Sequence, residues 1–174
     1  YLLAGPRGSG KTTIARILSK TINCVGRSNT PEPCNQCAQC LEFNSGRSLD
    51  LIEIDAASNR GIDEIRGLRE NVRFGPSFGR YKVYLIDEAH MITGPAFNAF
   101  LKTLEEPPAH AIFILATTEA HRLPATIISR TQRFDFKRLS AAELVGRLNT
   151  LCQKEKVAAE PEVLRLIAHE ADGS

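Results

Sequence analysis

A glycine-rich run near the start of the chain carries the residue types that bind phosphate. Residues 5–12 read G-P-R-G-S-G-K-T, which matches the pattern G-x-x-x-x-G-K-[S/T]. Glycines let backbone N–H groups close around a phosphate at the start of a helix, where unpaired donors and the helix dipole favour anions. Lys11 adds charge beside the β- and γ-phosphates, and the Thr12 hydroxyl should bind Mg²⁺. We therefore expect a nucleoside triphosphate to be held by Gly5, Gly8, Ser9, Gly10, Lys11, Thr12 and Thr13.

Two carboxylates end an apolar run in the middle of the chain. Residues 83–88 read V-Y-L-I-D-E, and a strand of this kind would carry both acids to its carboxyl edge, beside the phosphate-binding loop. Asp87 would hold Mg²⁺, and Glu88 would orient and polarise the attacking water. A phosphate-binding loop alone separates neither ATP from GTP nor a hydrolase from a kinase. The Asp-Glu pair favours ATP hydrolysis.

Four of the five cysteines lie close together in the sequence, with the spacing C-x9-C-x2-C-x2-C in a segment that has few apolar residues to pack. In a cytosolic chain such clusters are more often metal ligands than disulfides. Four thiolates suit tetrahedral Zn²⁺, whose binding would stabilise the segment, but the C-x2-C-x2-C run is also typical of one arm of an iron–sulfur site. Spacing alone leaves both metals open for Cys24, Cys34, Cys37 and Cys40. The fifth, Cys152, is expected to be a core thiol on a helix.

The phosphate-binding loop and the acidic pair must be positioned by the strands and helices around them, and the sequence predicts that strands alternate with helices. Apolar runs bounded by charge or turn residues predict strands, and apolar residues at helical spacing predict the helices between them. The expected strands are residues 1–4, 51–55, 82–86 and 112–116. One helix is expected over residues 11–23. Two more are expected from their apolar stripes, which are Ile62, Ile65, Leu68 and Val72 in the first and Phe97, Phe100, Leu101 and Leu104 in the second. This alternation predicts a doubly wound α/β fold whose mostly parallel sheet is covered on both faces.

A different pattern begins near residue 140, where strand signals cease. Ser140 and Glu143 form a capping-box sequence ahead of a helix with the apolar stripe Leu144, Leu148, Leu151 and Cys152, and another helix is expected beyond Pro161. We expect an α/β nucleotide-binding domain over 1–139, with 24–46 inserted as a cysteine module, and the start of an all-helical lid over 140–174. Both ends of the sequence look like cuts from something longer.

Composition narrows the class of protein. The 174 residues are 43% hydrophobic and 24% charged, with a formal net charge of +2, which gives no strong basic field of the kind seen in dedicated nucleic-acid binders. No apolar run approaches the length of a membrane helix and no signal peptide opens the chain, so a cytoplasmic location without a membrane partner is expected. Any contact with DNA would be local, for instance through Arg60, Arg66, Arg69 and Arg73, although such charges are usually a solvated helix face.

The run from Asp87 to Pro108 resembles one protein family closely. It reads D-E-A-H-M and then, from residue 97, F-N-A-F-L-K-T-L-E-E-P-P, and with the P-loop it resembles the AAA+ ATPases, within them the gamma/tau clamp-loader subunits of bacterial DNA polymerase III. The resemblance covers almost the whole chain and implies a structural zinc module at the cysteines. It also implies that I-L-A-T-T at 114–118 is the sensor strand, with Thr118, or else Thr117, contacting the γ-phosphate or the lytic water. His90 could simply hydrogen-bond the strand end.

The same resemblance implies an oligomeric machine. I-I-S-R-T at 127–131 resembles a Ser-Arg-Cys motif, which makes Arg130 an arginine finger toward a neighbour's ATP, with Thr131 where cysteine is usual. The implied function couples ATP binding and hydrolysis to loading a sliding clamp on primed DNA, with delta, delta-prime and further gamma/tau copies as partners. The alternatives are another AAA+ DNA motor, which would not need the cysteine module, and a non-catalytic loader subunit, whose nucleotide site would be degenerate. Residues that grip adenine, and a sensor-2 arginine, are expected outside this sequence.

Overall fold

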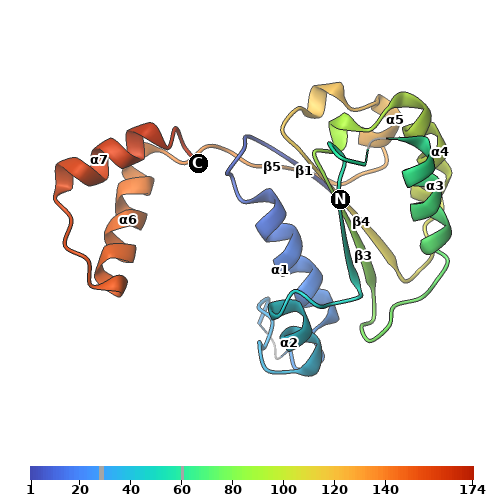
Figure 1. Ribbon diagram of the computed structural model, residues 1–174, viewed down its shortest axis with the longest axis horizontal. Helices are drawn as coiled ribbons and strands as arrows, with labels where there is room; N and C mark the ends of the chain where they lie inside the picture. The colour runs from blue at the N-terminus through green and yellow to red at the C-terminus, as the bar shows by residue number, and fades with distance from the viewer. Residues whose placement is uncertain (28–29, 60) are drawn as a thin grey trace.

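A five-stranded parallel sheet forms the centre of the molecule (Figure 1). The computed structural model describes residues 1–27, 30–59 and 61–174. The sheet has the strand order β2-β3-β4-β1-β5, and each neighbouring pair is parallel. The strands are β1 (Leu2–Ala4), β2 (Leu51–Asp55), β3 (Lys82–Asp87), β4 (Ala111–Thr117) and β5 (Arg133–Asp135). The predicted doubly wound α/β fold is confirmed, and the edge strand β5 is an addition that the apolar pattern did not reveal.

Helices follow the strands as the sequence pattern predicts. The longer ones are α1 (Lys11–Asn23), α3 (Ile62–Asn71), α4 (Gly94–Glu105), α6 (Ala141–Glu155) and α7 (Pro161–Glu170); the shorter ones are α2 (Ala38–Asn44), α5 (Ala125–Ile128) and the 3-10 turns η1 (Ala89–Met91) and η2 (Ala120–Arg122). Helix α4 ends ahead of two consecutive prolines, which cannot continue a helix. Among the described residues, no helix is long and apolar enough to cross a membrane.

Both faces of the sheet are buried because successive side chains of β3 point in opposite directions. Tyr84 and Ile86 belong to the apolar cluster under α3 and α4, whereas Val83 and Leu85 belong to the cluster under α1. In the first cluster the Tyr84 and Phe113 rings stack with centroids 5.2 Å apart. The Phe100 ring meets Phe113 edge-on, also with centroids 5.2 Å apart. These contacts hold β3 and β4 at fixed positions beneath the helices.

Helices α6 and α7 pack against each other and stand apart from the sheet (Figure 1). The capping box at Ser140 and Glu143 forms as predicted. The expected apolar stripe is only partly covered: Leu144 is buried, Leu148 and Cys152 are half-buried, and Leu151 is exposed. Among the described residues α7 is the main element packed against α6, so the apolar face of α6 is incompletely buried. The helices begin where the sequence predicts, and the division into domains at residue 139 stays a prediction.

The aromatic cluster under α3 and α4 gives a direct test of the core. Phe100 is 0% exposed, whereas the Phe78 side chain is 69% exposed. We expect Phe100→Ala to lower the free energy of unfolding by about 3–5 kcal/mol, because it removes ring contacts and leaves a cavity. The matched Phe78→Ala change should alter it by no more than about 0.5 kcal/mol. Urea unfolding curves measure both values, and equal losses for the two variants would contradict this assignment of the core.

Candidate active site and metal centre

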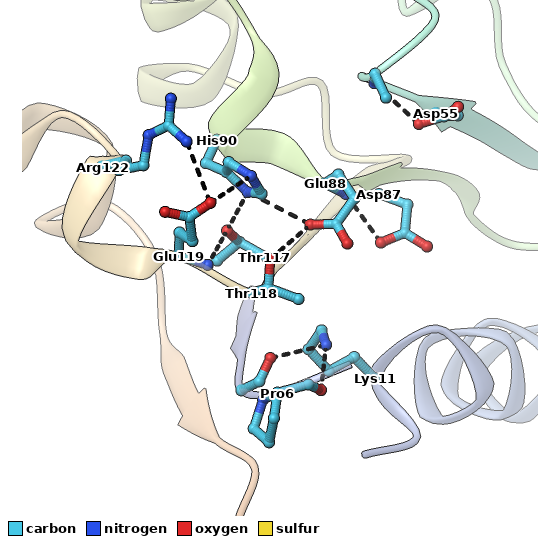
Figure 2. Close-up of polar contacts among 12 residues, drawn as sticks. Pro6, Lys11, Asp55, Asp87, Glu88, His90, Thr117, Thr118, Glu119 and Arg122 are labelled. Carbon is cyan, nitrogen blue, oxygen red and sulfur yellow. Dashed lines mark hydrogen bonds and ion pairs between the residues drawn. The ribbon is translucent and has the colours of Figure 1, made fainter. Parts of the chain in front are cut away.

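Parallel strands bring the predicted chemistry to one edge of the sheet (Figure 2). The phosphate loop follows β1, Thr118 follows β4, and the acidic pair ends β3, so all three meet at the carboxyl edge. The sequence predicted that the acidic pair lies beside the phosphate loop. In the sheet, however, β4 separates β1, which leads into the loop, from β3, which carries the acids. The contact is made through helix α1, where Thr12 Oγ1 donates to Asp87 Oδ2 at 2.8 Å. The two predicted Mg²⁺ ligands are therefore adjacent.

The phosphate loop has a backbone that only glycine adopts easily. Gly10, which precedes α1, has a φ of 90°, in the left-handed region that side chains disfavour. A Cβ added to Gly5 would lie 2.5 Å from the carbonyl oxygen of Phe136, so this position excludes any larger residue. The Ser9 hydroxyl donates to the carbonyl of Pro6 at 2.7 Å and closes the loop on itself. These glycines are therefore required by the loop's shape.

Lys11 is held over the loop. Its Nζ donates to the carbonyl oxygens of Gly5 and Pro6, each at 2.8 Å (Figure 2). The side chain is buried, and this burial lowers the pKa of the Lys11 ammonium, although the charges of Glu88 and Asp87 act in the opposite direction. Lys11 borders a cavity of about 450 Å³, a size typical of small-ligand sites. The cavity is lined by Arg7, Gly8, Gly10, Lys11, Thr12, Thr13, Asp87 and Glu88.

The acidic pair sits at a sharp turn of the backbone. Glu88 has a φ of 47°, a left-handed conformation that costs on the order of 1–3 kcal/mol for a residue with a side chain. Its backbone N–H donates to the Asp87 side chain at 2.9 Å. Thr118 Oγ1 donates to Glu88 Oε2 at 3.0 Å, so the residue favoured as the sensor meets the predicted catalytic carboxylate. The strained turn allows Asp87 and Glu88 to face the same cavity.

Three residues next to this site take part in a polar network that the sequence argument did not foresee. Thr117, the alternative sensor residue, is fully buried, and its hydroxyl lies 2.9 Å from His90 Nδ1. The same hydroxyl accepts the backbone N–H of Glu119 at 3.0 Å. His90 does meet the end of a strand, as expected, but the strand is β4 and the ring also lies near two carboxylates. In the sequence, the signal that pointed to His90 was its position just after Asp87 and Glu88.

Arg130 is not among the residues that line the cavity, and it pairs within its own chain. Its guanidinium is 2.7 Å from Glu105 Oε1 and donates to the carbonyl of Thr126 at 2.8 Å. The side chain is partly exposed. Among the described residues, its hydrogen bonds and ion pair do not reach this chain's own phosphate loop, and the predicted action on a neighbouring subunit stays a prediction.

The cysteine cluster has the shape of a metal site. The four Sγ atoms of Cys24, Cys34, Cys37 and Cys40 lie within 4.8 Å of one another. Two of the pairs, Cys34 with Cys40 and Cys24 with Cys37, are 4.0 Å apart. Tetrahedral zinc with four ligands at about 2.3 Å requires sulfurs about 3.8 Å apart, so these residues fit a Zn²⁺ ion closely.

The thiols differ in how readily they lose a proton. Burial acts to raise the pKa of Cys37, but hydrogen bonds, among them those from the backbone N–H groups of Cys40 and Val25, outweigh burial and lower the pKa to about 6. Burial raises the pKa of Cys40 to about 12. A metal ion would have to displace the Cys40 proton, so binding would release protons.

The arginines predicted near DNA are only partly described. Arg60 lies outside the described residues. Arg66 is exposed and pairs with Asp63 at 3.1 Å, while Arg69 and Arg73 are exposed and border a shallow cavity of about 350 Å³ beside Lys102. This arrangement fits a solvated helix face, and contact with DNA stays a prediction.

Comparison with known sequences gives consistent matches. A family profile described as DNA polymerase III, delta subunit, matches residues 1–140. The chain is 56% identical over 173 residues to the DNA polymerase III subunit tau of Bacillus subtilis, covering 99% of this chain and 31% of that protein. It is 49% identical over 174 residues to the subunit tau of Escherichia coli, covering 100% of this chain and 27% of that protein. The chain therefore spans about a third or less of the length of these relatives.

Solved structures support the fold. A crystal structure of a DNA polymerase III gamma subunit-related protein from Thermotoga maritima matches with a TM-score of 0.52 and 25% identity, covering 94% of this chain and 58% of that one. The RuvB Holliday junction branch migration motor of the same organism matches with a TM-score of 0.61 and 17% identity, covering 96% of this chain and 47% of that one. The second likeness shows the fold alone, and together they confirm the predicted AAA+ P-loop class.

The thiol geometry predicts specific metal binding. We expect the purified chain to hold one Zn²⁺ and to lose it on Cys37→Ser, with a lower melting temperature, because three thiolates no longer close the site. Zinc affinity should fall as the pH is lowered, since protons compete for the thiolates. Elemental analysis and thermal melting with a chelator measure both effects. The control is Cys152→Ser, which lies outside the cluster; equal zinc loss in that variant, or iron in place of zinc, would contradict the assignment.

Proposed function

Since this chain belongs to the DNA polymerase III delta-subunit family and its relatives include the tau subunits, we propose that it is the ATP-hydrolysing core of a clamp-loader subunit. Its activity would couple ATP binding and hydrolysis to the loading of a sliding clamp on primed DNA during replication. The observation that carries the proposal is the Thr12 to Asp87 hydrogen bond at 2.8 Å, which joins the phosphate loop to the acidic strand. A degenerate site, as expected of a non-catalytic loader subunit, would lack this pairing of intact motifs.

The residues around the cavity divide the chemistry between them. Backbone N–H groups at the start of α1 and the Lys11 ammonium would bind the β- and γ-phosphates. Thr12 and Asp87 would hold Mg²⁺, which when bound supplies positive charge to the phosphate oxygens. Glu88 would orient the attacking water and accept its proton. Thr118, which donates to Glu88 Oε2, would align this carboxylate or contact the γ-phosphate.

Catalysis would be completed between subunits. Arg130 is partly exposed and is not among the residues that line its own cavity, so we propose that it reaches the ATP of a neighbouring loader subunit and stabilises the charge of the transition state. Its pairing with Glu105 would have to open on assembly. The isolated chain should then hydrolyse ATP slowly.

The remaining partners follow from the family. We propose a structural Zn²⁺ at the four cysteines, which stabilises a segment whose described residues include one short helix, α2. The proposed partners are the delta and delta-prime subunits, further gamma/tau copies, the sliding clamp and primed DNA, all in the cytoplasm. An AAA+ motor of another class would not need the cysteine module.

ATP turnover by the full-length parent tests the proposal. It should be slow alone and rise strongly once the other loader subunits, the clamp and primed DNA are added together. Glu88→Gln should lower the stimulated rate by about 100-fold or more, because it removes the general base, and Arg130→Ala should lower it by about 1,000-fold, because it removes the finger.

The matched control is Arg165→Ala, an arginine on α7 whose side chain is 70% exposed; it should leave turnover unchanged. A rate of ATP turnover that does not change when the clamp and primed DNA are added would place the protein in another class of AAA+ motor. Full stimulated activity in the Arg130→Ala complex would refute the role given to that arginine.

A further inference from the structure

We infer that His90 is a positioning residue for Glu88, an inference that rests on the proposed ATPase function. The imidazole is almost fully buried, with 6% of its side chain exposed, and it lies between two carboxylates (Figure 2). Nδ1 is 3.4 Å from Glu88 Oε2, and Nε2 is 3.3 Å from Glu119 Oε1. A polar ring buried at this depth needs partners, and here one of them is the predicted catalytic base.

The chemistry of these partners fixes the ring. A carboxylate oxygen only accepts hydrogen bonds, so the ring stabilises Glu119 through a proton on Nε2 and Glu88 through a proton on Nδ1, and it serves both carboxylates when both nitrogens carry a proton. Nδ1 lies 2.9 Å from the Thr117 hydroxyl, which is itself anchored by the backbone N–H of Glu119 at 3.0 Å. The ring is therefore held at both nitrogens, by Thr117 at the end of β4 and by Glu119, which follows the strand and precedes η2. It cannot rotate without breaking contacts on both sides.

This fixed ring limits where the Glu88 carboxylate can lie. Thr118 Oγ1 donates to Glu88 Oε2, and His90 Nδ1 stands beside the same oxygen. Among the described residues, the hydrogen bonds and ion pairs of this carboxylate all involve Oε2. One oxygen is thus anchored, and Oε1 is left to accept a proton from a water molecule. A general base needs its acceptor atom at a defined position, and a displacement of about 1 Å can cost on the order of 100-fold in rate.

His90 also connects Glu88 to the segment that leads to the proposed finger. Glu119 accepts from Arg122 at 3.1 Å, and both belong to the stretch that runs through η2 into α5, just ahead of Arg130. The contacts run from Glu88 through His90 to Glu119 and Arg122. His90 therefore lies between Glu119 and the proposed base.

Two substitutions of His90 test the contacts of Nδ1 and Nε2 separately. In His90→Asn the side-chain amide takes the place of Nδ1 and keeps a polar contact with Thr117 and Glu88, whereas in His90→Gln the longer side chain reaches toward Glu119 and leaves Glu88 without this neighbour. The assay is ATP turnover by the full-length parent, assembled with the other loader subunits, clamp and primed DNA. ATP affinity is followed in parallel with a fluorescent ATP analogue.

We expect His90→Gln to lower kcat by about 10- to 100-fold while the KM for ATP changes by less than about 2-fold, since a displaced base affects the chemical step and leaves nucleotide binding intact. His90→Asn should keep kcat within about 3-fold of wild type. The control is His121→Asn, a histidine that also contacts Glu119, at 3.8 Å, but is 78% exposed; it should leave both constants unchanged. If His90→Gln does not fold, His90→Ala takes its place in the same comparison.

Three outcomes count against the inference. Wild-type kcat in His90→Gln would overturn it, and so would equal losses in the Asn and Gln variants, since loss of the Nδ1 neighbour would then not be the cause. A rise in KM that matches the fall in kcat would indicate a merely structural residue. Failure of the proposed function is distinct: there, Glu88→Gln would turn over ATP like the wild type, whereas an inactive Glu88→Gln beside a fully active His90→Gln sinks the inference alone.

Discussion

The parallel register of β1, β4 and β3 is the constraint on which the site depends. It pairs Ala4 with Thr117 and Leu115 with Ile86, so the three strands end at nearly the same level. The phosphate loop, Thr118 and the acidic pair leave the sheet at this level from three different strands. A shift of one residue in any strand would turn its side chains to the opposite face. The proposed catalytic arrangement therefore exists in one register only, and the buried aromatic and aliphatic residues on both faces of β3 and β4 maintain that register.

The residues of the site contribute less to the stability of the fold than the residues of the sheet. Lys11 is a buried ammonium, Glu88 has a left-handed backbone conformation, and His90 is buried between carboxylates. Burying Lys11 and His90 carries a desolvation cost that apolar residues would avoid, whereas the left-handed backbone at Glu88 carries a conformational cost that glycine would avoid. The core beneath the sheet offsets these costs, and the strained turn holds the acids toward the cavity.

Much of the fold and part of the site follow from local sequence. Helix α1 spans the predicted residues 11–23, because the glycine loop ahead of it and its apolar spacing are both local signals. The acidic strand and the cysteine cluster are equally local. Strand β5 escaped prediction because its three residues are exposed and form a strand only through pairing with β1.

The network around His90 could not be predicted from local signals. It joins residues about 30 positions apart, on neighbouring strand ends, and only the register of β3 with β4 brings them together. The same holds for β4 lying between the loop and the acids, and for the exposed Leu151, whose burial depends on what packs against α6. Local sequence patterns identify the residues that could bind or react with a ligand, but they do not show which residues of neighbouring strands those side chains will contact.

The central claim is that the phosphate loop and the acidic edge form one ATP site. A crystal structure of the full-length parent with Mg²⁺ and a non-hydrolysable ATP analogue tests it most directly. Our account predicts the β- and γ-phosphates at the start of α1 within reach of Lys11, the metal ion beside Thr12 and Asp87, and Glu88 facing the γ-phosphate. Phosphates bound elsewhere, or a metal ion remote from Asp87, would contradict it.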